Sequence, residues 1–307
     1  MSDSAVDLSR TIGSATDLQS VVRTMKALAA SSIGQYEQSV RALAAYYQTV
    51  ALGLSACLRA NMARPAPAAA AHTQRRVAGR VVVVFGSDQG LVGRFNETVS
   101  DLVVSHLSES AVPVTLWAVG ERVHVRLLDA GITAFGPLAV PQSVKGITAL
   151  VGQVLLKTEA AQCDQALTEL LVFHNRPATG AVYSPVVQRL LPMDDAWRRN
   201  LAALAWPTRN LPEVIRGGAV TLRVLVAEYL FVSLFRACAE SLASENASRL
   251  AAMERADQNI SDLLEELRRR FNQLRQSSID EELFDVVAGF EALSGSKPDR
   301  PAGQNRS

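Results

Sequence analysis

The amino-acid sequence predicts an α/β plus coiled coil fold, in which long N- and C-terminal helices form an antiparallel coiled coil with a central Rossmann-like α/β domain. Apolar residues recur at steps of three and four near both ends of the chain, strand and helix signals alternate between them, and proline is absent from residues 1–64 and 219–293. We expect residues 1–63 to be the N-terminal coiled-coil helix, 64–78 a linker, 79–205 the central α/β domain, 206–294 the C-terminal coiled-coil helix and 295–307 a flexible tail.

The two terminal helices are expected to be very long. They would span roughly 85 and 110 Å, whereas a compact domain of about 120 residues is about 35 Å across. Neither fits inside a globule, so their apolar stripes are expected to bury against each other; two shorter helices in an ordinary bundle are the alternative. The stripe of the first helix contains Leu18, Val22, Met25, Ala29, Ile33, Tyr36, Val40, Leu43, Tyr47, Val50 and Leu54, and that of the last contains Leu250, Met253, Ile260, Leu264, Leu267, Phe271 and Leu274.

The central segment alternates between short apolar runs and helical patterns. Strands are predicted at residues 81–85, 112–119, 132–135 and 167–175, and helices at 96–108, 121–129 and 144–158. Because the strands are apolar on both faces, the alternation predicts a mainly parallel sheet covered by helices. The run after Pro177 is expected to be an edge strand, since Pro185 has no N–H group to donate to a central ladder.

Charge and cysteine content exclude several classes of function. Thirty-one basic and thirty acidic residues leave a net charge of +1, so no overall field favours nucleic acid or an anionic membrane. Three widely separated cysteines argue against a disulfide framework and against a C-x-x-C zinc or redox site. A reducing cytoplasm fits this distribution of the three cysteines, which are Cys57, Cys163 and Cys238.

No segment of the sequence is predicted to cross a membrane. The N-terminus lacks the basic and apolar regions of a secretory signal. The most apolar long stretch, residues 220–239, carries Arg223, Glu228 and Arg236 at intervals that would place charges at every depth of a bilayer. We interpret this stretch as a buried helix.

A glycine-rich turn follows the first strand, in the run RVVVVFGSDQGLVGRFN at residues 80–96. Its glycines are spaced G-x-x-x-G-x-x-G, which differs from the dinucleotide fingerprint G-x-G-x-x-G, and the sequence contains no Gly-Lys pair for a Walker loop. We therefore expect a structural loop rather than a phosphate cradle, made by Ser87, Asp88, Gly90 and Gly93. A metal ligand or a cap on the following helix are the possible roles of Asp88, and the cap or turn is favoured.

The sequence indicates no catalytic centre. Neither G-x-S-x-G nor H-E-x-x-H occurs, so no nucleophile or zinc motif is present. The histidines are scattered at positions 72, 106, 124 and 174, which local spacing does not assemble into a triad or a metal cluster. We expect no catalytic residue, no metal and no cofactor.

Three stretches together resemble the gamma subunit of F-type ATP synthases. The C-terminal run at residues 244–293 contains N-x-x-R-Q-x-x-I-x-x-E-L and ends in V-x-G, which is similar to the most characteristic segment of that family. RTMKALAAS at residues 23–31 resembles its K-A-M-x-M-V-A-A-S helix, and SDQGLVGRFN at residues 87–96 resembles its S-D-x-G-L-C-G-x-x-N turn. Val92 replaces the usual cysteine, and residues 294–307 extend past the usual end, so the chain resembles a divergent bacterial member.

This resemblance implies a central-stalk rotor without a catalytic site of its own, which couples ion flow through the membrane sector to ATP synthesis or hydrolysis in the catalytic ring. The implied partners are the alpha and beta subunits of that ring, the epsilon subunit and the c-subunit ring, with no nucleic acid. The implied location is the cytoplasmic face of the bacterial inner membrane, where the chain is peripheral. A coiled-coil scaffold protein carrying a Rossmann-like domain and a soluble Rossmann-type enzyme are the alternatives.

The resemblance also assigns contacts to particular residues. Arg275 and Gln276 correspond to the pair with which the family's rotor catches a beta subunit, and both are expected beside the apolar seam of the last helix. The sequence does not reveal which loops dock on the c-ring, and residues 142–145 or 176–180 are the candidates. Further contacts of the shaft with the ring are implied for Arg23, Met25, Ile279 and Glu282.

Overall fold

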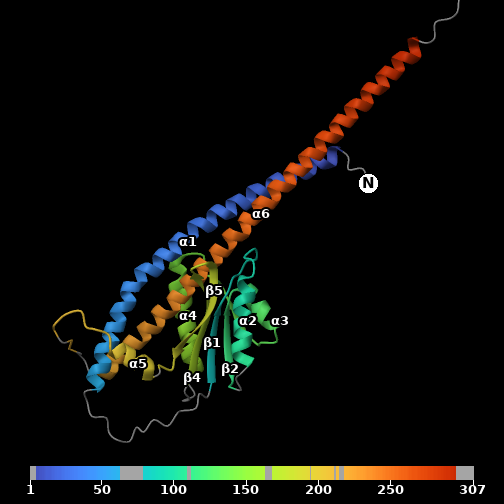
Figure 1. Ribbon diagram of the computed structural model, residues 1–307. Helices are drawn as coiled ribbons and strands as arrows, with labels where there is room; N and C mark the ends of the chain where they lie inside the picture. Colours follow the sequence, from blue (N-terminus) through green and yellow to red (C-terminus); the bar gives the residue numbers. More distant parts are fainter. Residues whose placement is uncertain are drawn as a thin grey trace, which may run out of the picture. The chain divides into compact units, whose positions relative to one another are not determined.

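The computed structural model describes residues 5–62, 79–108, 112–162, 168–193, 195–210, 212–213 and 218–294. Two helices dominate it, α1 (Ala5–Met62) and α6 (Gly218–Ser294) (Figure 1). The chain divides into two compact units. Unit 1 contains residues up to Thr24 and from Glu254 onward, and unit 2 contains Met25–Met253. Each long helix contributes to both units.

Unit 2 is built around a five-stranded sheet in the order β3-β2-β1-β4-β5. The strands are β1 (Gly79–Phe85), β2 (Val114–Val119), β3 (Phe135–Leu138), β4 (Thr168–Ala178) and β5 (Ala181–Leu191). The first four are mutually parallel, whereas β5 is antiparallel to β4 at the edge, where Pro185 lies opposite Asn175. The mainly parallel sheet and its proline-containing edge strand confirm the sequence prediction.

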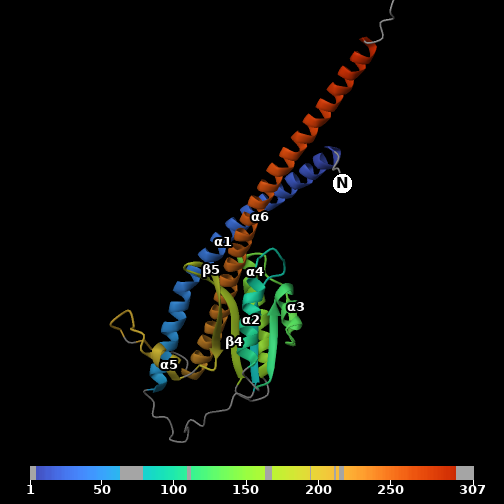
Figure 2. The ribbon, with the colours of Figure 1, turned by 45° about the vertical axis from the view of Figure 1, so that its right-hand side comes forward.

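Helices cover both faces of this sheet, as Figures 1 and 2 show. One face packs on α2 (Phe95–Ser108) and α3 (Glu121–Asp129), and the other on α4 (Val144–Gln162) and the part of α6 within unit 2. Successive valines of β1 alternate between these two cores, because side chains of a strand point to opposite faces. Valines 81–84 are all at most 1% exposed, which accounts for the unbroken apolar run.

The start of one strand and the presence of one short helix differ from the prediction. The third strand begins at Phe135 rather than at Ile132, because the turn that ends α3 extends to Ile132. Gly131 adopts a left-handed φ of +79°, and the Ile132 N–H donates to the carbonyl of Leu127, a Schellman-type helix end. The short helix α5 (Asp195–Ala202) was not predicted, since eight residues give little periodic signal.

The apolar start of α6 was predicted to be a buried helix, and the structure confirms this for its second half. Among the described helices, α6 alone has the length and apolar composition that could cross a membrane. Tyr229, Val232 and Leu234 are nevertheless buried within unit 2, whereas Val220 and Val224 in the first turns are exposed. Its apolar content therefore serves core packing from about Tyr229 onward.

In unit 1, the beginning of α1 and the later part of α6 lie side by side and antiparallel (Figures 1 and 2). The buried residues of α1 there are Leu8, Ala15 and Val22, which recur every seven residues as in a coiled coil. Leu18, which was predicted in the stripe, is 54% exposed. On α6 the buried residues of this unit are Ile260 and Leu264.

Candidate functional site

The glycine-rich turn after β1 is held by hydrogen bonds centred on Ser87. The Ser87 N–H donates to Asn96 Oδ1 at 3.0 Å, and Asn96 Nδ2 donates back to Ser87 Oγ at 2.8 Å. Ser87 Oγ in turn donates to the carbonyl of Gln89, and the Arg122 N–H donates to the carbonyl of Ser87. Ser87 is fully buried, so these partners satisfy a side chain that would otherwise be costly to bury.

Asp88 joins two further connections of the sheet. Its carboxylate accepts from the Glu121 N–H at 3.1 Å, at the first residue of α3, and from the Val140 N–H at 2.9 Å, before α4. The cap was expected on the next helix along the chain, α2, but it lies on α3 because parallel strands bring their carboxyl ends to one edge. A negative charge at that position also interacts favourably with the N-terminal end of the helix dipole.

At three positions near this turn, steric contacts or a left-handed backbone conformation favour glycine. A Cβ on Gly86 would lie 2.3 Å from Cβ of Val123, so a side chain would separate β1 from α3. Gly120 has a φ of +111°, and a Cβ there would lie 2.8 Å from the backbone of Ser87. Gly93 has a φ of +56°, whereas the nearest atom to a Cβ on Gly90 is 3.9 Å away, in Arg122.

The first backbone N–H groups of the turn are already hydrogen-bonded within the chain, so they are not available to a phosphate. The Gly86 N–H donates to the carbonyl of Val119, and that of Ser87 is taken by Asn96. Within the described part of the chain, no group of three or more His, Cys, Asp or Glu side chains could hold a metal ion. The contacts support the interpretation of Ser87, Asp88 and Gly93 as parts of a structural loop.

The predicted shaft contacts near the N-terminus have different surroundings. Arg23 Nε pairs with Asp257 Oδ1 at 3.1 Å, and Gln19 Nε2 donates to the same oxygen at 3.2 Å and to Ser261 Oγ at 2.8 Å. Arg23 is therefore occupied by a contact between the two helices of unit 1. Met25 is half-buried.

The predicted catch residues lie on a part of α6 that is exposed on every side. Residues 272–291 are all exposed, including Arg275, Gln276 and Glu282. The expected seam ends early: Leu267 and Phe271 are half-buried, but Leu274 is 38% exposed. Beyond it the exposed apolar side chains are Ile279, Leu283, Phe284, Val286, Val287 and Phe290, at 47–73%.

The two loops suggested for docking occupy separate parts of unit 2. Residues 142–145 lead into α4, and the Gln142 side chain bonds only weakly to the Val140 carbonyl, at 3.5 Å. Residues 176–180 end β4 and form its turn into β5. The Arg176 side chain is 42% exposed, and its Nε donates to Glu240 Oε2 at 2.7 Å.

A cluster of ionisable groups around the buried Glu240 was not predicted. His174 Nε2 lies 3.0 Å from Glu240 Oε2, and Arg236 Nε donates to the other carboxylate oxygen at 2.7 Å. Burial opposes ionisation of Glu240, but hydrogen bonds from His174, Arg236 and Arg176 outweigh it and lower its pKa to about 2. Burial lowers the pKa of His174, so the ring is neutral and donates Nε2–H to the carboxylate.

The sequence carried a partial signal for this cluster. Arg236 and Glu240 are four residues apart on one helix, and His174 and Arg176 are two apart on one strand face. Nothing in the sequence paired the helix with the strand. The pairing therefore required the tertiary structure.

Comparison with known proteins places these features in a family. A family model described as ATP synthase matches residues 4–293. The ATP synthase gamma chain of Moorella thermoacetica is 27% identical over 94% of this chain and 98% of its own, and that of Haemophilus influenzae is 23% identical over 94% and 99%.

Solved structures share the fold. A chain of the Euglena gracilis mitochondrial ATP synthase in rotational state 3 aligns with a TM-score of 0.59 at 15% identity, covering 98% of this chain and 99% of its own. One from the Tetrahymena thermophila mitochondrial ATP synthase central stalk and c-ring has a TM-score of 0.52 at 22% identity, covering 77% and 99%. With the match of the family model over nearly its whole length, the chain belongs to the ATP synthase family, as a gamma chain.

Proposed function

We propose that this chain is the central-stalk rotor of an F-type ATP synthase. It couples ion flow through the membrane sector to ATP synthesis or hydrolysis in a ring of alpha and beta subunits. The observation that carries the proposal is the exposed apolar end of α6, residues 279–290. Membership of the gamma-chain family favours this function over a coiled-coil scaffold or a Rossmann-type enzyme.

The exposed apolar end has the chemistry of a shaft enclosed by other subunits. Leu283, Phe284, Val286 and Phe290 are each 61–73% exposed, on a helix end that no other described residue covers. Contiguous apolar surface of this kind marks an interaction site in a soluble protein. At about 3.6 residues per turn these side chains share one broad side of the helix, which is the side expected to contact a surrounding subunit.

The rotor is proposed to act without a catalytic site of its own. Its effect on catalysis would come from contacting each surrounding subunit differently in each orientation, since only a difference in contact free energy shifts a conformational equilibrium. In the loop, Ser87 and Asp88 form their hydrogen bonds with other residues of this chain, which agrees with a role without a catalytic site.

Arg275 and Gln276 are proposed to form the catch for a beta subunit. Both are exposed, and neither side chain hydrogen-bonds to another residue that the structure describes. Arginine offers a planar fork of donors for a carboxylate, and glutamine adds a donor and an acceptor. Arg23, Met25, Ile279 and Glu282 are proposed as further contacts of the shaft, with Arg23 acting mainly through Asp257.

The remaining partners are proposed from the family. The epsilon subunit and the c-subunit ring would bind the chain, which would make it peripheral to the cytoplasmic face of the bacterial inner membrane. A gamma chain is in any case a peripheral part of the membrane-bound complex. The domain boundaries at 63, 78, 205 and 294 and the docking loops stay predictions.

Truncation tests the proposal. A chain ending at Phe271 should fail to support ATP-driven ion pumping when reconstituted with the other subunits, because it lacks the exposed apolar end. A control chain ending at Ser294 should pump normally. Normal pumping by the shorter chain, with alpha and beta subunits bound, would contradict the rotor assignment.

A further inference from the structure

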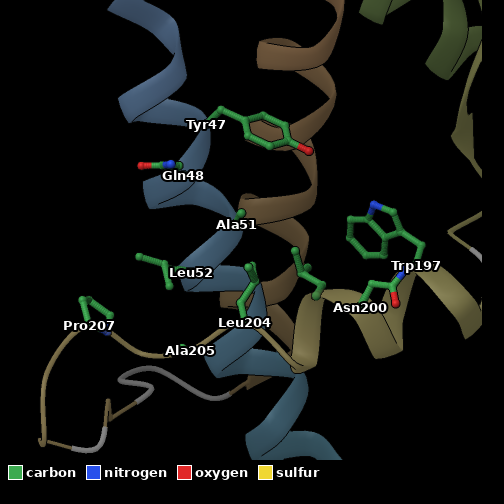
Figure 3. Close-up of a pocket in the computed structure, with 10 residues that line it drawn as sticks. Tyr47, Gln48, Ala51, Leu52, Trp197, Asn200, Leu204, Ala205 and Pro207 are labelled. Atoms are coloured by element: carbon green, nitrogen blue, oxygen red, sulfur yellow. The ribbon is translucent and has the colours of Figure 1, made fainter.

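A cavity of about 480 Å³ lies in unit 2 beside Trp197, between α1, α5 and the segment after α5 (Figure 3). Half of its lining residues are exposed to solvent. None of its lining side chains, all of which the structure describes, buries a polar atom without a hydrogen-bond partner. The groups around this cavity therefore select no particular ligand.

A smaller cavity of about 100 Å³ lies in unit 2, where α1 and α6 meet the loops that follow β1 and β3. It is below the size of sites for organic ligands, which run from about 300 to 1,000 Å³, but has room for an ion or a few water molecules. Gln89 and Gln142 are exposed, so the cavity is open to solvent there. Its lining residues are Ser32, Tyr36, Asp88, Gln89, Val140, Pro141, Gln142, Leu242, Glu245, Asn246 and Arg249.

Glu245 lines this cavity and has a carboxylate oxygen that lacks a partner. The residue is 6% exposed, and its Oε1 accepts from Arg249 Nη2 at 2.7 Å. Its Oε2 is also buried, but it has no hydrogen-bond partner among the residues that the structure describes. Because an unpaired buried carboxylate oxygen is costly, a ligand that carries positive charge would be stabilised beside it.

Other side chains of the lining present further oxygen atoms. Ser32 Oγ donates to the carbonyl of Leu28 at 2.9 Å, and Asn246 Nδ2 donates to the carbonyl of Leu242 at 2.8 Å. Because these protons are used within the helices, the oxygens of both side chains keep lone pairs for a ligand. Tyr36 is 6% exposed, and its hydroxyl forms no hydrogen bond with another described residue. The lining therefore has a surplus of acceptors.

The charged residues of the lining leave one negative charge uncompensated. They are the carboxylates Asp88 and Glu245 and the guanidinium of Arg249. Both oxygens of Asp88 already accept backbone N–H groups, so it contributes charge rather than a free oxygen. Burial raises the pKa of Glu245, the guanidinium of Arg249 opposes this rise, and the charge of Asp88 adds to it. The environment of Glu245 therefore favours one added positive charge.

We infer that this cavity binds a small monovalent cation, held by Glu245 Oε2 together with the oxygens of Tyr36 and Ser32. Alkali-metal and ammonium ions share the required size and charge. A divalent ion is disfavoured, because no group of three or more described His, Cys, Asp or Glu side chains surrounds the cavity and one carboxylate oxygen alone is free. The bound ion would link α1 to α6. This site goes beyond the rotor function and does not depend on it.

Thermal unfolding of the full-length chain, followed by circular dichroism, tests the inference. The chain is compared in the chlorides of sodium, potassium, ammonium and choline at one ionic strength, with choline as the cation that is too large for the cavity. A cation at about ten times its dissociation constant should raise Tm by about 2–4 °C over choline, because it binds only the folded chain. The shift should saturate, and the cation with the largest shift distinguishes an alkali-metal ion from ammonium.

Glu245→Gln should abolish this shift. The carboxamide keeps the size of the side chain and an acceptor for Arg249, but it removes the charge. Glu265→Gln is the matched control, because Glu265 pairs with Arg269 at the same spacing on the same helix but is 78% exposed. It should keep the shift of the wild type.

Tyr36→Phe removes only the hydroxyl from the cavity. It should weaken the apparent binding of the cation by roughly two- to tenfold, the value of one neutral hydrogen bond. Tyr46→Phe is its control, since Tyr46 lies on the same helix, outside the lining, and is 43% exposed. This pair decides the question if Glu245→Gln does not fold.

Four results would overturn the inference. They are equal Tm values in choline and in every small cation, an equal shift in the two glutamate variants, an equal concentration dependence in the two tyrosine variants, and a larger shift with magnesium chloride that Glu245→Gln abolishes. Each variant must show a cooperative unfolding transition. Since unfolding is measured on the isolated chain, these results do not depend on whether the chain drives a rotary complex.

Discussion

At the scale of single residues, the most connected side chains are those that join separate connections of the sheet. Asp88 bonds to two backbone N–H groups 19 residues apart, at Glu121 and Val140. Glu240 receives bonds from one histidine and two arginines. In both cases a single carboxylate joins groups that belong to separate segments of the chain.

Replacing Asp88 by Ala should destabilise the chain by about 1–3 kcal/mol, because the N–H groups of Glu121 and Val140 lose their acceptor. Urea unfolding measures the change. Asp101→Ala, at an exposed position of α2, is the control and should be near neutral. Neither the wild type nor the variant should bind ATP in equilibrium dialysis; saturable binding lost on substitution would show that the loop is a nucleotide site.

Removing the proposed catch should slow turnover without unfolding the helix. Arg275→Ala together with Gln276→Ala would delete contacts worth roughly 1.5–3 kcal/mol where a charged group takes part. We expect lower ATP hydrolysis by the reconstituted complex, with unchanged assembly and helix content. The control pair, Arg268→Ala with Gln273→Ala, alters exposed residues of the same helix. Equal turnover in the wild-type, catch-variant and control complexes would contradict the assignment of the catch.

The cluster around Glu240 should make stability depend on pH. Burial lowers the pKa of His174 below its ordinary value of 6.5, so its contribution to stability is present above that value and is lost as pH falls. Glu240, with its pKa lowered from 4.5 to about 2, contributes above 4.5 and loses its contribution on the way down to about 2.

His174→Gln should therefore flatten the loss of stability between pH 7 and pH 5, measured by urea unfolding at a series of pH values. His106→Gln, outside the cluster, is the control and should keep the wild-type slope. An identical slope in the wild type and in the His174 variant would show that this histidine does not carry the effect.

At the scale of elements, each long helix buries side chains only where another segment of the chain packs against it. In unit 1 the seam of α1 recurs every seven residues through Leu8, Ala15 and Val22, and hydrogen bonds from Gln19 and Arg23 to Asp257 flank it. On α6, side-chain burial ends at about Phe271. Beyond Phe271 the apolar residues of that helix are exposed.

Val22→Asp should separate the two helices of unit 1. Val22 is 6% exposed, so the substitution removes about 1.5–3 kcal/mol of apolar burial and adds the cost of a buried carboxylate. Val21→Asp is the matched control, because Val21 is the neighbouring residue and is 56% exposed. Thermal unfolding followed by circular dichroism should show a lowered transition only for Val22→Asp, and equal curves would refute the seam.

At the scale of the whole molecule, the chain combines a helical pair with an α/β body, and each part has its own core. The body buries two clusters on either side of its sheet. The pair in unit 1 buries a narrow seam. In the proposed rotor, the helices would transmit torque and the body would bind the c-ring.

Replacing the body at residues 79–205 by a short linker should uncouple the proposed rotor. ATP hydrolysis by the reconstituted complex should persist, because the ends of the helices remain, whereas ATP-driven ion pumping should be lost. A complex with the intact chain is the control. Normal pumping without the body would dismiss its role in docking.

The sequence by itself determined the long helices, the alternation of strands and helices, the edge position of the strand with Pro185 and the family of the chain. These follow from periodicity, from proline chemistry and from a local motif, all of which are properties of neighbouring residues. The absence of a phosphate motif at Gly86, Gly90 and Gly93 was equally local.

Only the tertiary structure decided which helix Asp88 caps, that Arg176 and His174 meet Glu240, and that the cavity beside Trp197 exists. It also decided that Leu18 and Leu274 are exposed although both continue an apolar stripe. The reason is that a pattern specifies which face of an element is apolar, whereas the distant segment that covers that face is chosen by how the whole chain packs.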